Sequence, residues 1–149
     1  MPKSKYIKRK TSVDKNNLIK RNTDVIEEEI EQTGNDKRVF VSIKNLQHQY
    51  QCFSSWNKND MNKFWAFNEK VHNMTWAQIF KTGGKNKKTG IACTTISRDR
   101  YKNIPFIKSL SKDISMIELR IDNKIRVHGF RINSVFYLCV LDKNHDITK

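Results

Sequence analysis

Residues 114–147 read ISMIELRIDNKIRVHGFRINSVFYLCVLDKNHDI, and this segment is the most informative part of the chain. Apolar and polar side chains alternate over three consecutive segments, which are separated by Asp122-Asn123-Lys124 and Asn133-Ser134. Such alternation is typical of strands that bury one face, and Asn, Asp and Ser are frequent in the turns between strands. The sequence therefore predicts three consecutive antiparallel strands.

The first hairpin has two candidate registers, and the apolar residues distinguish them. A two-residue turn would pair Leu119 with His128, which sets an apolar side chain against an imidazole. A three-residue turn pairs Leu119 with Val127 and Glu118 with His128, so that apolar residues face apolar residues and polar residues face polar residues. We adopt the three-residue turn, because a slip of one residue moves every side chain of a strand to the other face.

The second hairpin should place Phe130 opposite Tyr137 and His128 opposite Cys139. One face of the sheet is then apolar and would be covered by a helix that begins at Asn59 or Asp60. Its members are Ile117, Leu119, Ile121, Ile125, Val127, Phe136, Leu138 and Val140. The other face is expected to meet solvent, and it holds Glu118, Arg120, Arg126, His128, Phe130 and Tyr137.

The remaining elements follow from shorter patterns. Apolar alternation predicts strands at 38–43 and 49–53 and an edge strand at 91–96, and helical spacing of apolar residues predicts a helix through about His72. Thr75 should cap a second short helix that ends at Gly83-Gly84. The fold class expected is α+β, a small antiparallel sheet with two short helices packed on one face.

Charge divides the chain into parts. Residues 1–22 hold eight basic residues and one acid, and residues 23–36 hold six acids and no base, which predicts a disordered basic tail followed by a short acidic helix. Residues 37–149 form the single α+β domain, with 21 basic and 8 acidic residues, a balance of 21 − 8 = +13. The acidic segment has two interpretations: a solvated helix, or an acidic strip that folds over the cationic face of the domain.

A domain of this charge favours nucleic acid as partner, because Lys and Arg that neutralise phosphates release counterions. The alternative is a solvated surface that uses Lys and Asn heavily. No apolar run reaches the ~18 residues of a membrane span, so we expect a cytoplasmic protein without a membrane partner. Three widely spaced cysteines and four scattered histidines predict no disulfide framework, metal or cofactor.

The polar face carries groups suited to cutting RNA through its own 2′-hydroxyl, a reaction that needs a base, an acid and a cation on the phosphorane. Glu118 and His128 are candidates for base and acid, and His145 is a second candidate for proton transfer. Arg120 opposite Arg126 would be relieved by a bound phosphate or, in the alternative, screened by Glu118 and Asp122.

Further residues are candidates for holding nucleic acid. The glycine-rich loop 81–90 is basic, a short polar segment follows the edge strand, and aromatic rings on the polar face can stack on bases. The predicted nucleic-acid-binding residues are Lys85, Lys87, Lys88, Arg98, Arg100, Phe130, Tyr137 and Lys143.

The last part of the chain resembles the C-terminal sheet of the RelE/ParE superfamily of bacterial toxins. Leu119-Arg120, a short turn, Arg126-Val127 and the apolar run VFYLCVL match its elements, and the preceding helices and strand 39–43 are similar to its helical layer and opening strand. The resemblance covers about residues 38–147. This chain is longer than a typical member, and no terminal Tyr follows His145.

The resemblance implies a toxin, either an mRNA endoribonuclease that acts on the ribosome or a gyrase inhibitor, held silent by an acidic antitoxin. By motif position, Arg126 matches the arginine that contacts the scissile phosphate, Glu118 and Arg120 match the preceding strand, and His145 matches the terminal acid/base site. We expect a metal-independent endoribonuclease. The alternatives are a non-catalytic nucleic-acid-binding or gyrase-inhibiting module of a phage or mobile element, or an interaction protein of such an element that binds an acidic partner.

Overall fold

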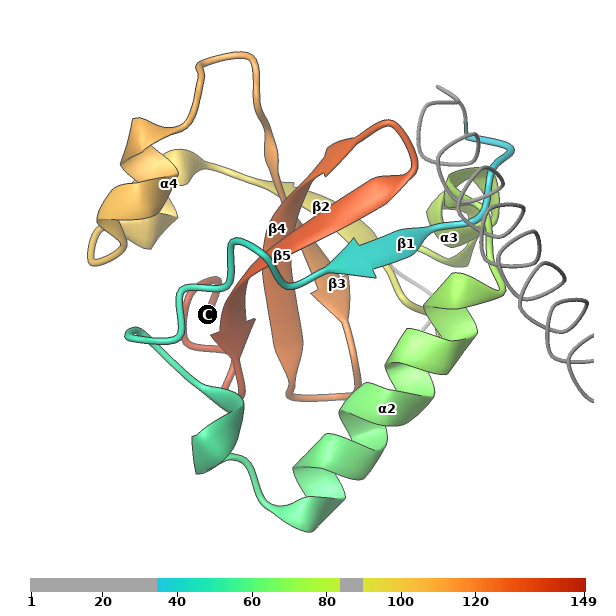
Figure 1. The fold of residues 1–149 in the computed structure, drawn as a ribbon, viewed down its shortest axis with the longest axis horizontal. Helices are drawn as coiled ribbons and strands as arrows, with labels where there is room; N and C mark the ends of the chain where they lie inside the picture. Colours follow the sequence, from blue (N-terminus) through green and yellow to red (C-terminus); the bar gives the residue numbers. More distant parts are fainter. Residues whose placement is uncertain (1–34, 84–89) are drawn as a thin grey trace, which may run out of the picture.

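The computed structural model describes residues 35–83 and 90–149, which contain a five-stranded sheet of order β1-β5-β4-β3-β2 (Figure 1). The strands are β1 (Phe40–Ser42), β2 (Cys93–Ile96), β3 (Met116–Arg120), β4 (Arg126–Ile132) and β5 (Val135–Asp142). Strands β2 to β5 pair antiparallel, as expected, but β1 pairs with β5 in parallel. The prediction of a wholly antiparallel sheet is wrong, because the first strand joins the last and the long connection between them permits a parallel pair.

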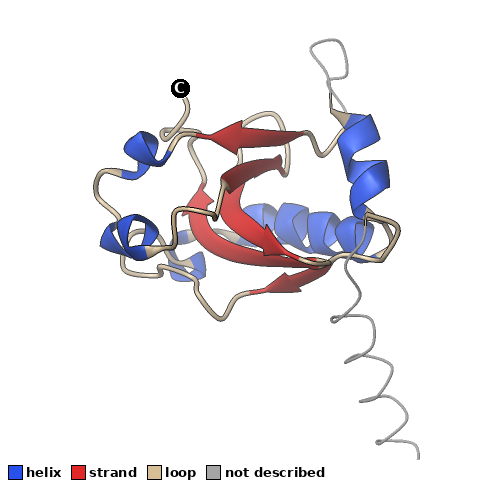
Figure 2. Ribbon diagram, turned by 90° about the horizontal axis from the view of Figure 1, so that it is seen from above, coloured by secondary structure: helices blue, strands red, loops and turns tan. Residues whose placement is uncertain are grey.

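Three α-helices and two short 3₁₀ helices accompany the sheet in the described part of the chain. They are α2 (Lys58–His72), α3 (Trp76–Thr82), α4 (Pro105–Ser109), η1 (Phe53–Ser55) and η2 (Arg98–Tyr101). Figure 2 shows the short helices gathered at one end of the sheet and α3 at the other. The predicted strand at 49–53 is wrong, since the amides of Tyr50 and Gln51 bond to the Gln47 carbonyl in a local turn.

Capping boxes fix the starts of the two longer helices. The Asn57 side chain accepts from the amide of Asp60 at 2.9 Å, and the Asp60 carboxylate accepts from the amide of Asn57 at 3.1 Å. Helix α2 therefore begins slightly earlier than predicted, with Asp60 at its third position. Thr75 and Gln78 make the same reciprocal pair at α3, which confirms the predicted cap.

The register of the first hairpin is the predicted one. Glu118 faces His128, Leu119 faces Val127, and Arg120 faces Arg126 across β3 and β4. The three-residue loop closes with the amide of Ile121 bonded to the carbonyl of Ile125 at 3.0 Å.

The second hairpin departs from prediction at a β-bulge. Phe130 faces Tyr137 as expected, but His128 faces Val140 instead of Cys139, and Gly129 faces Leu138. The extra residue on β5 shifts the alternation, so that Leu141 joins the apolar face and Asp142 faces Arg126. Simple alternation placed Val140 on the apolar face, and the bulge moves it to the other face.

Gly129 permits this bulge because the two strands approach closely there. A Cβ atom at position 129 would lie 2.0 Å from the carbonyl oxygen of Tyr137 and 2.9 Å from a ring carbon of Phe136. No side chain fits at that distance without movement of the backbone.

Both faces of the sheet are covered by apolar residues. On one side, Phe64, Phe67 and Val71 of α2 pack with sheet residues such as Leu119 and Val127, as predicted. On the other side, the second apolar cluster joins residues of η2, α4 and the C-terminal segment to the sheet: Tyr101, Ile104, Ile107, Met116, Phe130, Cys139, Val140 and Ile147. Helices therefore lie on both faces, and the expectation of helices on one face only is wrong.

We expect Gly129→Ala to lower the free energy of unfolding by about 3 kcal/mol, because overpacking against a fixed backbone is costly. Gly83→Ala is the matched control, since a Cβ there meets nothing closer than 3.4 Å. Urea unfolding followed by circular dichroism measures both variants. Equal stability of the two variants would contradict the close approach at Gly129.

Candidate functional site

A buried imidazole lies at the centre of the polar face. The His128 side chain is fully buried, and its Nε2 atom lies 3.4 Å from Oδ2 of Asp142 and 3.6 Å from Oε2 of Glu118. Among the described residues this Nε2 atom has no hydrogen bond of good geometry. The expectation that His128 faces solvent is wrong, because the second apolar cluster covers it. A protonated His128 would pair with both carboxylates.

Tyr101 holds the other side of the same ring. Its hydroxyl lies 2.8 Å from Nδ1 of His128, and the two rings meet edge to face at 5.4 Å. Burial raises the pKa of Tyr101, and the negative charges of Glu118 and Asp142 raise it further. The phenol therefore stays protonated, so it fixes the orientation of the imidazole.

Asp142 is buried at the end of β5 and receives two backbone amides. The amide of Asp146 donates to Oδ1 at 2.8 Å and that of Ile147 donates to Oδ2 at 3.1 Å. Burial raises the pKa of Asp142, but His128 and the two amides together outweigh burial and hold that pKa below its ordinary value. The charged carboxylate thus anchors the C-terminal segment to the sheet.

Arg126 is buried, which contradicts the expected pair of solvent-facing arginines. Its Nη1 atom donates to the carbonyls of Asp122 at 2.6 Å and Ile125 at 3.1 Å, and its Nε atom lies 3.6 Å from Glu118. Burial lowers the pKa of Arg126, an effect that Glu118 opposes. A bound phosphate was expected between Arg126 and the half-buried Arg120. Instead, these two carbonyls and Glu118 bind the Arg126 guanidinium.

His145 lies on the solvent-facing side of the polar group formed by Glu118, Arg126, His128 and Asp142. Its Nε2 atom is 3.7 Å from Oε2 of Glu118, and its side chain is 29% exposed. The same carboxylate oxygen accepts a hydrogen bond from the Thr148 hydroxyl. Glu118 therefore connects the buried His128 to the partly exposed His145.

A cleft of about 440 Å³ opens beside this pair. Its walls come from β2, η2, β3 and the C-terminal segment: Thr94, Thr95, Ile96, Ser97, Arg100, Glu118, His145 and Thr148. A carboxylate, an imidazole, an exposed guanidinium and several hydroxyls thus line one open space. We call this space the Glu118 cleft.

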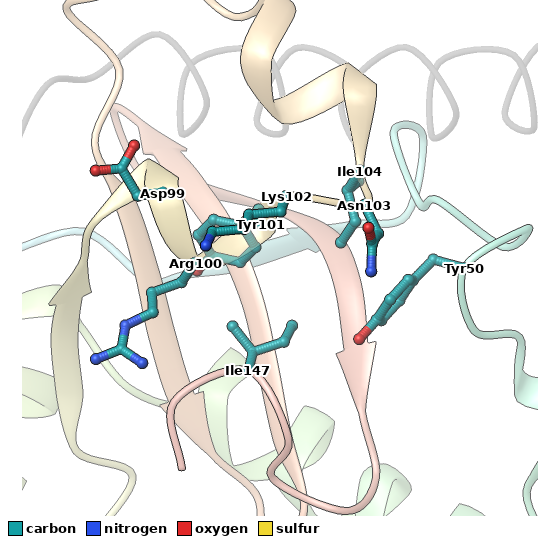
Figure 3. Close-up of a pocket in the computed structure, with 8 residues that line it drawn as sticks. All are labelled: Tyr50, Asp99, Arg100, Tyr101, Lys102, Asn103, Ile104 and Ile147. Atoms are coloured by element: carbon teal, nitrogen blue, oxygen red, sulfur yellow. The ribbon is translucent and has the colours of Figure 1, made fainter.

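A second hollow of about 280 Å³ adjoins the Glu118 cleft, and Arg100 lines both. Figure 3 shows Ile147 between the side chains of Arg100 and Tyr50 in this view. Ile147 lines the second hollow and the next residue, Thr148, lines the Glu118 cleft. The C-terminal segment therefore contributes to both spaces.

The other predicted binding residues are scattered. Arg98 donates to the carbonyls of Leu110, Ser111 and Ile114, which ties η2 to the end of α4. Lys143 pairs with Asp60 at 2.8 Å. Lys85, Lys87 and Lys88 lie outside the described residues, as does the expected acidic helix.

The predicted stacking platform is a pair of rings that stack on each other. Phe130 and Tyr137 lie 5.1 Å apart with an angle of 16° between their planes, and Phe130 is buried. Phe130 is therefore a core residue and does not offer a face to a nucleotide.

Sequence reasoning missed Asp142, Thr148 and the contact of Tyr101 with His128. A glycine inside a strand often marks a bulge, and Gly129 was the available signal for the shift that brings Asp142 to this face. No local pattern indicates that Tyr101 and Thr148 approach residues about thirty positions away.

Comparison of the chain with protein-family models, with curated proteins and with solved structures finds no match in any of the three. Within residues 35–83 and 90–149, no group of three or more His, Cys, Asp or Glu side chains is arranged to hold a metal ion. No helix in the same residues is long and apolar enough to cross a membrane.

We expect Asp142→Asn to destabilise the protein by about 3 kcal/mol near pH 7, since it breaks a buried charge cluster. Because the folded-state pKa is lowered, the carboxylate stabilises the fold above the unfolded pKa of about 3.9 and loses this effect as pH falls through the folded value. The stability difference between wild type and variant should therefore shrink as pH falls below the unfolded pKa of about 3.9 and through the lowered folded-state pKa.

Urea unfolding at a series of pH values measures this difference. Asp146→Asn is the control, because its side chain is 61% exposed and pairs with Lys149 at 3.8 Å, so about 0.5 kcal/mol or less should be lost. A difference for Asp142→Asn that is constant with pH would contradict the assignment.

Proposed function

We propose that the protein is a metal-independent endoribonuclease of toxin type that cleaves mRNA in the cytoplasm. The observation that carries the proposal is the pair of proton-transfer groups in the Glu118 cleft. The carboxylate of Glu118 and the imidazole of His145 lie 3.7 Å apart, and Arg100 lines the same cleft. These are the kinds of group that attack by a 2′-hydroxyl requires.

The reaction balances with these groups alone. The 2′-oxygen forms a bond to phosphorus as its proton passes to the Glu118 carboxylate, and the bond from phosphorus to the 5′-oxygen breaks. A protonated His145 supplies a proton to that leaving oxygen, so that a cyclic 2′,3′-phosphate and a free 5′-hydroxyl result. Arg100 stabilises the charge on the phosphorane.

The buried part of the cluster positions Glu118. Arg126 lies 3.6 Å from one carboxylate oxygen and His128 lies 3.6 Å from the other. In this proposal Arg126 and His128 are positioning residues, and Arg100 takes the phosphate-contacting role that the RelE/ParE resemblance gives to Arg126. Of the two candidate histidines, His145 is favoured for contact with RNA because it alone is partly exposed.

The proposed substrate and partners come from the charge of the domain and from the RelE/ParE resemblance. Residues 37–149 hold 21 basic and 8 acidic residues, and a domain with an excess of cations binds phosphate backbones. The RelE/ParE resemblance adds mRNA on the ribosome as the substrate and an acidic antitoxin as the partner. Both additions belong to the proposal.

One observation favours a second candidate, a non-catalytic nucleic-acid-binding or gyrase-inhibiting module. Glu118 already accepts a hydrogen bond from Thr148 and lies within 3.7 Å of Arg126, His128 and His145. A carboxylate this heavily engaged is suited to holding the C-terminal segment in place. In that case the cationic surface binds nucleic acid without cutting it.

His145→Gln tests the proposal. Induction of the wild-type protein in a bacterial host should arrest growth and produce discrete new 5′ ends in total mRNA. The variant should reduce cleavage of a purified RNA by about a hundredfold or more, the usual contribution of a general acid or base. His48→Gln is the matched control, because His48 is exposed in the loop before η1 and does not line the Glu118 cleft.

Equal cleavage by wild type and His145→Gln would exclude the proposed role of His145. Intact mRNA together with double-strand breaks in DNA would favour gyrase inhibition. Intact nucleic acids together with binding that weakens steeply with salt would favour a plain binding module.

A further inference from the structure

A hollow of about 560 Å³ lies on the other side of β2 from the Glu118 cleft. Strand β2 is the edge of the sheet, with Thr94 opposite Glu118 and Thr95 opposite Ile117. Successive residues of a strand point to opposite faces, so these two threonines belong to different faces of the sheet. Thr95 nevertheless lines both spaces, so the two spaces adjoin at the sheet edge.

The floor of this hollow is a stack of flat groups. The guanidinium of Arg131 lies 4.7 Å above the centre of the Trp76 ring and 5.8 Å from the centre of the Phe80 ring. Trp76 is fully buried, whereas Phe80 is 45% exposed. Phe80 therefore extends the cation–π stack to the protein surface.

Hydrogen bonds hold this stack in place. The Trp76 indole donates to the carbonyl of Ser134 at 3.1 Å, and Nε of Arg131 donates to the carbonyl of Asn133 at 2.7 Å. Both bonds go to the turn between β4 and β5. Trp76 and Arg131 are thus held in place before any ligand arrives, which lowers the entropic cost of binding.

Polar groups around the platform match the edge of a base better than a phosphate. Asp113 and Ser115 line the hollow together with Thr95, and Asp113 is exposed. A carboxylate accepts hydrogen bonds from the amino groups of bases and repels a phosphate. An exposed aromatic ring next to a guanidinium, with such a rim, is the arrangement that stacks on unpaired bases of RNA.

We propose that this hollow is a nucleobase-binding pocket that takes a base of the RNA strand whose backbone lies in the Glu118 cleft. The inference rests on the proposed function, which supplies RNA as the ligand and the path of that RNA around β2. Phe80 stacks on the base, Arg131 supports the stack, and Asp113 accepts a hydrogen bond from an amino group of the base. The pocket gives the enzyme a preference for the base beside the cut, because adenine, guanine and cytosine carry an exocyclic amino group that can donate to Asp113 and uracil does not.

Binding of short 2′-O-methyl RNAs tests the pocket separately from cleavage, because these RNAs lack the attacking hydroxyl. An abasic unit is placed at each position in turn, and affinity is measured by fluorescence anisotropy. For the wild-type protein, one abasic position should weaken binding about tenfold, the usual worth of one stacked base. Phe80→Leu should remove that dependence, and Phe80→Tyr should retain it.

Trp65→Leu is the matched control, since Trp65 is an aromatic residue of α2 that is 61% exposed and does not line the pocket. Its binding should show the same abasic dependence as the wild type. Circular dichroism of each variant verifies folding, and Phe80→Tyr keeps the test valid if Phe80→Leu unfolds, because loss of abasic dependence in a folded Phe80→Tyr variant would also overturn the pocket.

Two further outcomes overturn the inference: binding by the wild type that no abasic position weakens, or an abasic dependence that a folded Phe80→Leu variant leaves unchanged. Failure of the proposed function gives a different result. If the wild-type protein leaves unmodified RNA intact while Phe80 still controls the abasic dependence, the pocket stands and the cleavage proposal falls.

Discussion

The close approach of β4 to β5 at Gly129 is the constraint on which the candidate site depends. It sets a bulge between His128 and Gly129, and the bulge reverses the faces of the last residues of β5. Asp142 thereby lies on the same face as Glu118 and His128 instead of pointing toward α2. From there its carboxylate binds two amides of the C-terminal segment, which brings His145 and Thr148 to Glu118. The geometry of the Glu118 cleft thus follows from one glycine.

Burial divides the polar residues into two groups with different roles. Arg126 and His128 are buried beside Glu118, so a large ligand cannot meet either side chain directly. His145 and Arg100 remain accessible at the edge of this polar cluster. Among the described residues, the polar groups of this cluster that reach solvent border the cleft beside β2.

The hairpin register between β3 and β4 was predictable because apolar residues match across it, and a slip by one residue would expose them. The starts of α2 and α3 depend on local capping by Asn57 and Thr75. The Thr75 cap was identified from the sequence, and the Asn57 cap was not. The bulge could not be located by alternation, since alternation assumes that every residue has one partner. Burial of the polar face was also missed, because Tyr101, Ile104 and Ile107 reach it through a tertiary contact that no local pattern of the segment reveals.

Cross-strand nuclear Overhauser effects measure the register of β4 against β5, which sets the face on which Asp142 lies. We expect contacts that place His128 opposite Val140 and Gly129 opposite Leu138, with Cys139 unopposed. We also expect proximity between the ring protons of His128 and the side chain of Tyr101. A regular ladder with His128 opposite Cys139 would return Asp142 to the face of α2 and would rule out the bulge as the origin of the candidate site.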